Sequence, residues 1–279
     1  MDQAGFEARA AAGGPATEAS PVLRYARRVT LIINAKAVAV SGLAVASMLL
    51  CRRYGLLADF PLTLIATAII FPIVFSIGGA YKRREAALDH YGNLKAHGRA
   101  LYFASRDWLA ETHADALAEA GESLGSLLGN CRALFAGTLD EMARHENAVY
   151  RDFSRLSLFI KDLREKGLAS GEVSRCNQYL SKMIISFETM KHIYQYRTPV
   201  TLRAYSDIFI LVLPILYGPY FAYLATEFSP GLEYLMPVLF AAILVGLDSI
   251  QAHLENPFDQ VGEDDIAINA EKFVERLRL

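Results

Sequence analysis

Histidine, cysteine and carboxylate side chains, the groups most often used in catalysis, are scattered through this sequence. No two of the six histidines stand three or four residues apart, so clusters that bind metal in membrane enzymes are absent. Glu141 and His145 would share one helix face, but a single such pair is more typical of a solvated contact. The cysteines, Cys51, Cys131 and Cys176, form no CxxC pair. Since the sequence also lacks a Walker loop, GxGxxG and GxSxG, we predict that the protein is not an enzyme.

One acidic segment, from Glu255 to Asp265, places several oxygen ligands close together. Calcium takes about six to eight oxygens from carboxylates and carbonyls. A possible calcium site would therefore use Asn256, Asp264 and Asp265, with Asp259 as a further ligand. The spacing is not that of an EF-hand loop, and a solvated acidic turn is the alternative interpretation.

Threonine and phenylalanine recur every four residues within the uncharged stretch 60–80, at Thr67, Phe71 and Phe75. That spacing keeps the three side chains near one face of a helix. The stretch is long enough to cross the ~30 Å core of a bilayer. Pro72 predicts a kink or break, and a broken helix in a membrane usually faces protein or water. We interpret this stretch as a candidate pore-lining helix; packing against a neighbouring helix is the alternative.

Three further apolar runs, at 29–51, 208–228 and 232–247, are read as the other membrane helices. Lys36 interrupts the first, where it is expected to extend its ammonium to the membrane interface; the alternative is an anion ligand. Charged residues crowd between 81 and 203, where apolar residues recur at helical spacing. The net charge of −2 argues against nucleic-acid binding.

These patterns predict an all-α membrane protein with four transmembrane helices and a cytosolic helical domain. The expected order is a disordered N-terminal tail (1–20), transmembrane helices 1–2 (21–80), the cytosolic helical domain (81–204), transmembrane helices 3–4 (205–250) and a C-terminal cytosolic segment (251–279).

Basic residues predict the orientation, because they concentrate on the cytoplasmic side of membranes. Four spans place both termini and the helical region on one side. That side carries Arg24, Arg27, Arg28, Lys82, Arg83, Arg84, Arg197 and Arg203, whereas the other carries Arg52 and Arg53. We therefore expect an integral, multi-pass membrane protein with both termini cytoplasmic, or stromal if the membrane belongs to a plastid.

Three segments resemble the bestrophin family. The stretch LDSIQAHLENPFD (247–259) is similar to the acidic-amide ENPF or EDPF element that follows the last span in that family. The stretch FPIVFSIGGAYKRREAALDHYGNL (71–94) is similar to its second span and the segment beyond it. The stretch RTPVTLRAYSDIFILVLP (197–214) is similar to the Thr-Pro element before the third span.

The resemblance implies a homopentamer in the lipid bilayer, mostly anion-selective, whose second span lines a hydrophobic neck. The family's three neck positions fall on Thr67, Phe71 and Phe75 in this chain. Thr67 departs from the usual apolar residue. Animal members carry a calcium clasp, but an apparent insertion and a shorter acidic run after residue 258 put calcium gating in doubt.

The expected function is a pentameric channel for chloride, possibly bicarbonate, or other small anions. Arg83 and Arg84, just beyond the neck, are expected to concentrate anions; the alternatives are a positive-inside signal or ion pairs. No cofactor is expected to be required. Two other functions stay open, a cation-conducting channel on the same scaffold and a non-conducting membrane scaffold.

Overall fold

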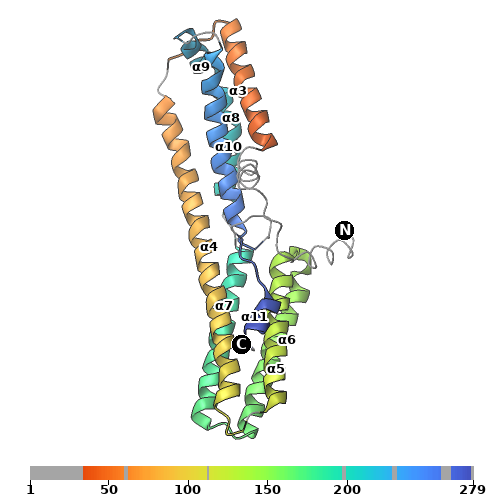
Figure 1. Ribbon diagram of the computed structural model, residues 1–279. Helices are drawn as coiled ribbons and strands as arrows, with labels where there is room; N and C mark the ends of the chain where they lie inside the picture. Colours follow the sequence, from red (N-terminus) through yellow and green to blue (C-terminus); the bar gives the residue numbers. More distant parts are fainter. Residues whose placement is uncertain are drawn as a thin grey trace, which may run out of the picture. The chain divides into compact units, whose positions relative to one another are not determined.

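The computed structural model describes residues 34–59, 62–111, 113–196, 199–227, 231–258 and 265–277. These residues form helices and connecting turns and contain no β-strand, so the all-α prediction is confirmed (Figure 1). The predicted disordered tail at 1–20 lies outside the described residues.

The chain folds into two compact units. The first contains the described residues up to Val74 together with Ala204–Ile250, and the second contains Phe75–Arg203 and the described residues from Gln251 onward. The predicted domain boundary at residue 80 falls inside helix α4 (Leu62–Asp107), and the first unit ends six residues earlier.

The first unit is built from apolar helices. It contains α3 (Ala35–Arg53), the start of α4, most of α8 (Val200–Leu216), α9 (Gly218–Leu224) and most of α10 (Leu235–Glu255). The short 3₁₀ turns η2 (Ala225–Glu227) and η3 (Leu232–Tyr234) lie between α9 and α10. Within the described residues, three stretches have the length and composition to cross a membrane: Ala35–Arg53, one in Ser170–Glu227, and Leu232–Glu255.

The apolar run 208–228 contains Pro214, Gly218 and Pro219, which predict a broken helix, and the chain does break there, between α8 and α9. Pro219 has no N–H for the carbonyl of Ile215, four residues earlier. The Ser47 hydroxyl on α3 donates to that carbonyl over 2.7 Å. Gly218 permits this approach, because a Cβ there would collide with the Ser47 side chain. A neighbouring helix thus supplies the hydrogen bond that the proline removes.

Helix α4, by contrast, continues through Pro72 over its full 46 residues (Figure 1). A break at Pro72 is therefore a wrong prediction.

The second unit is a helical bundle. It contains the rest of α4, α5 (Ala114–Ala136), η1 (Leu139–Glu141), α6 (Met142–Glu165), α7 (Ser170–Gln195) and α11 (Ala270–Leu277). Helix α6 packs against both α5 and α7, and α11 packs against α5. Buried residues of α4 recur every seven positions, as expected of a helix that keeps one face against its neighbours; they are Ala80, Ala87, Leu94 and Leu101.

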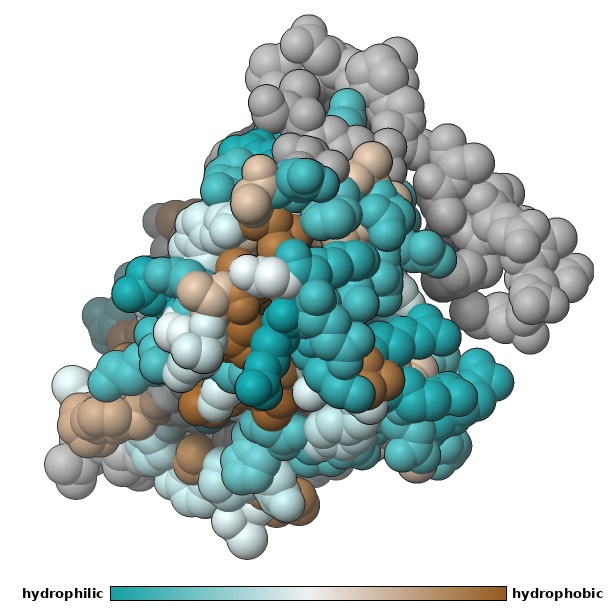
Figure 2. Space-filling view, turned by 90° about the horizontal axis from the view of Figure 1, so that it is seen from below, coloured by the Kyte–Doolittle hydropathy of each residue, from teal (hydrophilic) through white to brown (hydrophobic). Residues whose placement is uncertain are grey.

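Aromatic side chains form the centre of this unit. Phe135 on α5 lies against Phe187 and Tyr194 on α7, with ring centroids 6.3 and 5.6 Å away. Phe258, just beyond α10, stacks on Phe135 at 4.5 Å. The face shown in Figure 2 is mainly hydrophilic, with hydrophobic residues confined to narrow areas between polar ones.

Candidate functional site

The predicted neck residues form an exposed stripe along α4. Phe71 and Phe75 leave 59% and 65% of their surface exposed within one chain, whereas Ile73, about 200° around the helix from Phe71, is fully buried. The exposed Thr67 turns its hydroxyl inward along the helix, where it donates to the Thr63 carbonyl over 2.6 Å. One face of α4 is therefore packed, while the Thr–Phe–Phe face presents two large aromatic rings that are more than half exposed.

Arg83 and Arg84 lie two to three turns farther along the same helix, and both are half-buried. Arg84 forms an ion pair with Glu85, with Nη1 2.7 Å from Oε1. Glu85 is the next residue of the same helix, so this contact partly balances the charge of Arg84, and the role of the two arginines stays a prediction.

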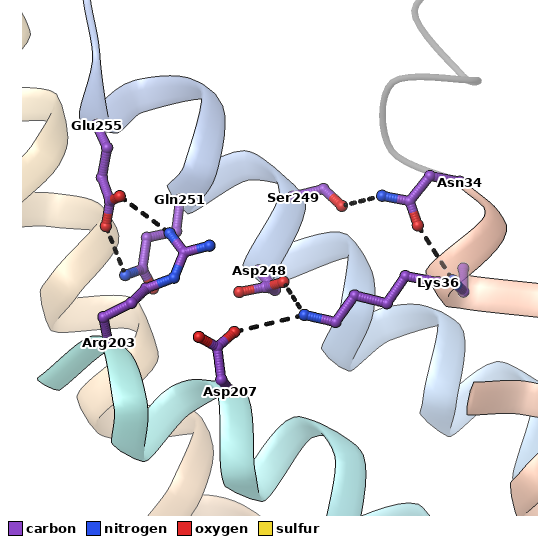
Figure 3. A network of polar contacts seen from close by, with 9 residues as sticks. Asn34, Lys36, Arg203, Asp207, Asp248, Ser249, Gln251 and Glu255 are labelled. Carbon is purple, nitrogen blue, oxygen red and sulfur yellow. Dashed lines mark hydrogen bonds and ion pairs between the residues drawn. The ribbon is translucent and has the colours of Figure 1, made fainter. Parts of the chain in front are cut away.

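A charged cluster that the sequence did not predict holds α3, α8 and α10 together within the first unit (Figure 3). Lys36 Nζ on α3 lies 2.7 Å from Asp248 Oδ2 on α10 and 3.4 Å from Asp207 Oδ1 on α8. Beside it, the Asn34 side chain donates to Ser249 Oγ over 3.2 Å and accepts from the N–H of Ala37. Asp248 is only 6% exposed, so Lys36 neutralises a buried carboxylate. These partners add an ion pair that the sequence did not reveal, and the expected position of Lys36 at the membrane interface stays a prediction.

Glu255, the first residue of the ENPF sequence, is held by two side chains of the second unit (Figure 3). Arg203 Nη1 lies 3.0 Å from Glu255 Oε2, and Gln251 Nε2 donates to Oε1 over 3.2 Å. Both carboxylate oxygens therefore have protein donors.

The residues after Glu255 form a turn that anchors Phe258 in the core. Asn256 Oδ1 accepts from the Phe258 N–H at 3.4 Å, and the Pro257 carbonyl accepts from the Ile266 N–H at 2.7 Å. Phe258 is 1% exposed. The polar residues of this motif thus position a buried aromatic ring.

Of the predicted calcium ligands, Asn256 and Asp265 are described, whereas Asp264 and the further candidate Asp259 lie outside the described residues. Asn256 is already engaged in its turn. Within the described ranges, no three or more His, Cys, Asp or Glu side chains come close enough to hold a metal ion.

No protein-family model and no curated protein matches this chain. Solved structures do match. A variant of a bacterial bestrophin homologue from Klebsiella pneumoniae superposes with a TM-score of 0.70 at 17% identity, over 87% of this chain and 96% of that chain. Another variant gives 0.70 at 18% identity, over 90% and 100% of the two chains. A further structure of that homologue gives 0.66 at 15% identity, over 87% and 96%.

The chain has a bestrophin-like fold. The likeness extends over almost the full length of those structures, so both units of this chain take part in it. The apolar stretches in a bestrophin-like fold indicate an integral membrane protein.

Proposed function

We propose that the protein is an ion channel selective for small anions such as chloride, assembled from five copies around one axis. The observation that carries the proposal is the exposed pair Phe71 and Phe75 on one face of α4. The two rings lie one turn apart on the same face of the helix, so both would project toward one axis. Five such helices around an axis would bring the rings together as a hydrophobic neck, with Thr67 as a more polar ring at one end.

Anion selectivity follows from the chemistry of such a neck. Aromatic rings have positive edges, and edges turned toward the axis would favour chloride over potassium. An apolar constriction can also close by losing its water. Arg83 and the partly neutralised Arg84 would raise the anion concentration at the cytoplasmic end of the neck.

We propose further that four membrane helices place both termini on the cytoplasmic side. The number of basic residues on the two sides supports this orientation. Gel-shift labelling of a single cysteine introduced near either terminus, with and without permeabilised membranes, would test it in a variant whose native Cys51, Cys131 and Cys176 are replaced by serine. Labelling of intact cells from outside would contradict the proposed orientation.

Selectivity is tested by the reversal potential of the purified protein in planar bilayers under a KCl gradient. We expect a reversal near the chloride equilibrium potential, and substitution by bicarbonate would then extend the series. The current should persist when a chelator removes calcium, because we propose that no bound metal is required. A reversal near the potassium potential would identify a cation channel. If the purified oligomer carries no current, whatever its symmetry, a non-conducting scaffold would be favoured.

The neck is tested by replacing Phe71 and Phe75 together by alanine. We expect a larger leak current in the closed state, because a wider and less apolar constriction holds water more readily. The matched control replaces Leu43 and Leu50, two exposed apolar residues of α3, and should leave conductance unchanged. Equal currents in the wild type and the Phe71→Ala/Phe75→Ala variant would show that these residues do not form the neck.

A further inference from the structure

A basic cleft in the second unit lies between α4 and α11. Its volume is about 610 Å³, which is in the range of small-molecule sites. Four cations line it, Lys95 and Arg99 from α4 and Lys272 and Arg276 from α11, and among the described lining residues none is acidic. Within the part of the chain that the structure describes, no carboxylate forms an ion pair with any of the four.

The spacing of these cations concentrates their charge. Lys95 and Arg99 stand four residues apart on α4, and Lys272 and Arg276 stand four apart on α11. Like charges at this spacing share one helix face and destabilise the helix. Here two such faces line the same cleft, so repulsion acts within each helix and between them.

The pKa of Lys95 reflects the repulsion between the cations of the cleft. Burial lowers the pKa of Lys95, and the positive charges of Arg99 and Arg276 lower it further. The carboxylate of the neighbouring Glu271 does not offset them, since it is bound by Arg132 Nη2 and Nη1 at 2.7 and 2.9 Å.

Two of the four cations lie over aromatic rings of the cleft wall. Lys95 Nζ lies 4.1 Å from the centroid of the Tyr91 ring, and the Arg99 guanidinium lies 5.8 Å from that of Phe273. Both rings are buried, and the backbone of Asn269 hydrogen-bonds Tyr91. The aromatic part of the wall is thus buried, and the cationic groups are the charged groups that a ligand in the cleft would meet.

We propose that this cleft binds an anion bearing several phosphate groups, either a soluble polyphosphate or the headgroup of a phosphorylated lipid. Arginine presents a planar fork that matches two phosphate oxygens, and lysine adds a point charge. Four cations in a cleft of this volume suit a compact ligand with several charges better than a single chloride ion. Binding requires no ion flux, so the proposal stands or falls separately from the channel.

The test is calorimetric titration of inorganic tripolyphosphate into the full-length protein in phosphatidylcholine nanodiscs. The test variant combines Arg99→Gln and Arg276→Gln, which removes one fork from each helix. The matched control combines Arg144→Gln and Arg151→Gln, which also removes two charges, on α6 of the same unit. Circular dichroism would verify that all three proteins are equally helical.

We expect tripolyphosphate to bind the wild type and the control alike, and the Arg99→Gln/Arg276→Gln variant at least tenfold more weakly. Repeating the titration in nanodiscs that contain a phosphoinositide then shows whether the natural ligand is a lipid headgroup or a soluble polyphosphate. Loss of tripolyphosphate binding in them indicates a lipid headgroup, and unchanged binding indicates a soluble polyphosphate.

Three results would overturn the proposal: no binding at millimolar tripolyphosphate, equal affinity in the wild type and the Arg99→Gln/Arg276→Gln variant, or equal losses in that variant and the control. Binding that appears only after the oligomer is dissociated would also overturn it, because an acidic segment of a second copy would then occupy the cleft.

Discussion

Replacing Phe258 by alanine should destabilise the second unit more than the loss of an exposed residue of similar size. Phe258 follows the last membrane helix in the sequence, yet it is 1% exposed and stacks on Phe135 at 4.5 Å. Phe135 in turn contacts Phe187 and Tyr194 of α7. The substitution would therefore open a cavity where three segments of the unit meet.

The expected loss can be worked out from this packing. Truncation of a fully buried phenylalanine to alanine costs about 3–5 kcal/mol, which includes the cavity left behind. The aromatic stacking within that loss contributes about 0.5–1.5 kcal/mol. A unit of this size shifts its midpoint by about 2–4 °C per kcal/mol. Phe258→Ala should therefore lower the midpoint by roughly 6–20 °C, and Phe258→Leu by much less, because it fills most of the cavity.

The chain offers a local reporter for the measurement, since its single tryptophan, Trp108, lies in the second unit. Thermal unfolding of the full-length protein in detergent is followed by fluorescence excited where tyrosine does not absorb. Leu158→Ala, at a position 63% exposed on α6, is the control and should leave the midpoint almost unchanged. A midpoint for Phe258→Ala within about 2 °C of that control would refute the assignment of Phe258 as a core anchor.

Two further predictions concern ion pairs. Lys36→Met should destabilise the first unit by about 3 kcal/mol, because it leaves Asp248 buried without this cation. Adding Asp248→Asn to this variant should recover part of the lost stability, as measured by thermal unfolding. Strictly additive losses from the two substitutions would contradict the pairing. Hydrogen bonds from Arg132 hold the pKa of Glu271 below its usual value. The pair therefore stabilises the fold at pH values above the pKa that Glu271 has in the unfolded chain. This stabilisation is lost as the pH falls through the lower pKa of Glu271 in the folded chain. Since both side chains are well exposed, Glu271→Gln should cost only about 0.5 kcal/mol at neutral pH and nothing in strong acid; a cost independent of pH would argue against the pair.

The helical architecture was predictable because it depends on periodicity. Apolar residues at helical spacing and uncharged runs of membrane length are properties of neighbouring positions, and they indicated an all-helical chain. The shared helix face of Phe71 and Phe75 was predictable for the same reason, because a spacing of four residues places both side chains on one face. Their role in a neck stays a prediction, because it depends on other copies of the chain.

The charged contacts were not predictable in the same way, because they join residues far apart in sequence. Lys36 meets Asp248 across 212 positions, and Arg132 meets Glu271 across 139. A lysine near the start of an apolar run is equally consistent with reaching the membrane interface, and nothing local identifies its partner. The useful signal was Asp248 itself, a carboxylate at the end of an apolar run that needs a cation once it is buried.

The prolines show why local rules fail at particular residues. Pro72 and Pro214 lie inside continuous helices, whereas the chain breaks beside Pro219. All three lack an N–H, so the missing donor alone does not end a helix. At Pro219 the chain also has Gly218, which lets α3 approach, and Ser47, whose hydroxyl satisfies the carbonyl of Ile215. The break thus coincides with a donor from another helix, and a sequence rule that considers only the proline cannot place it.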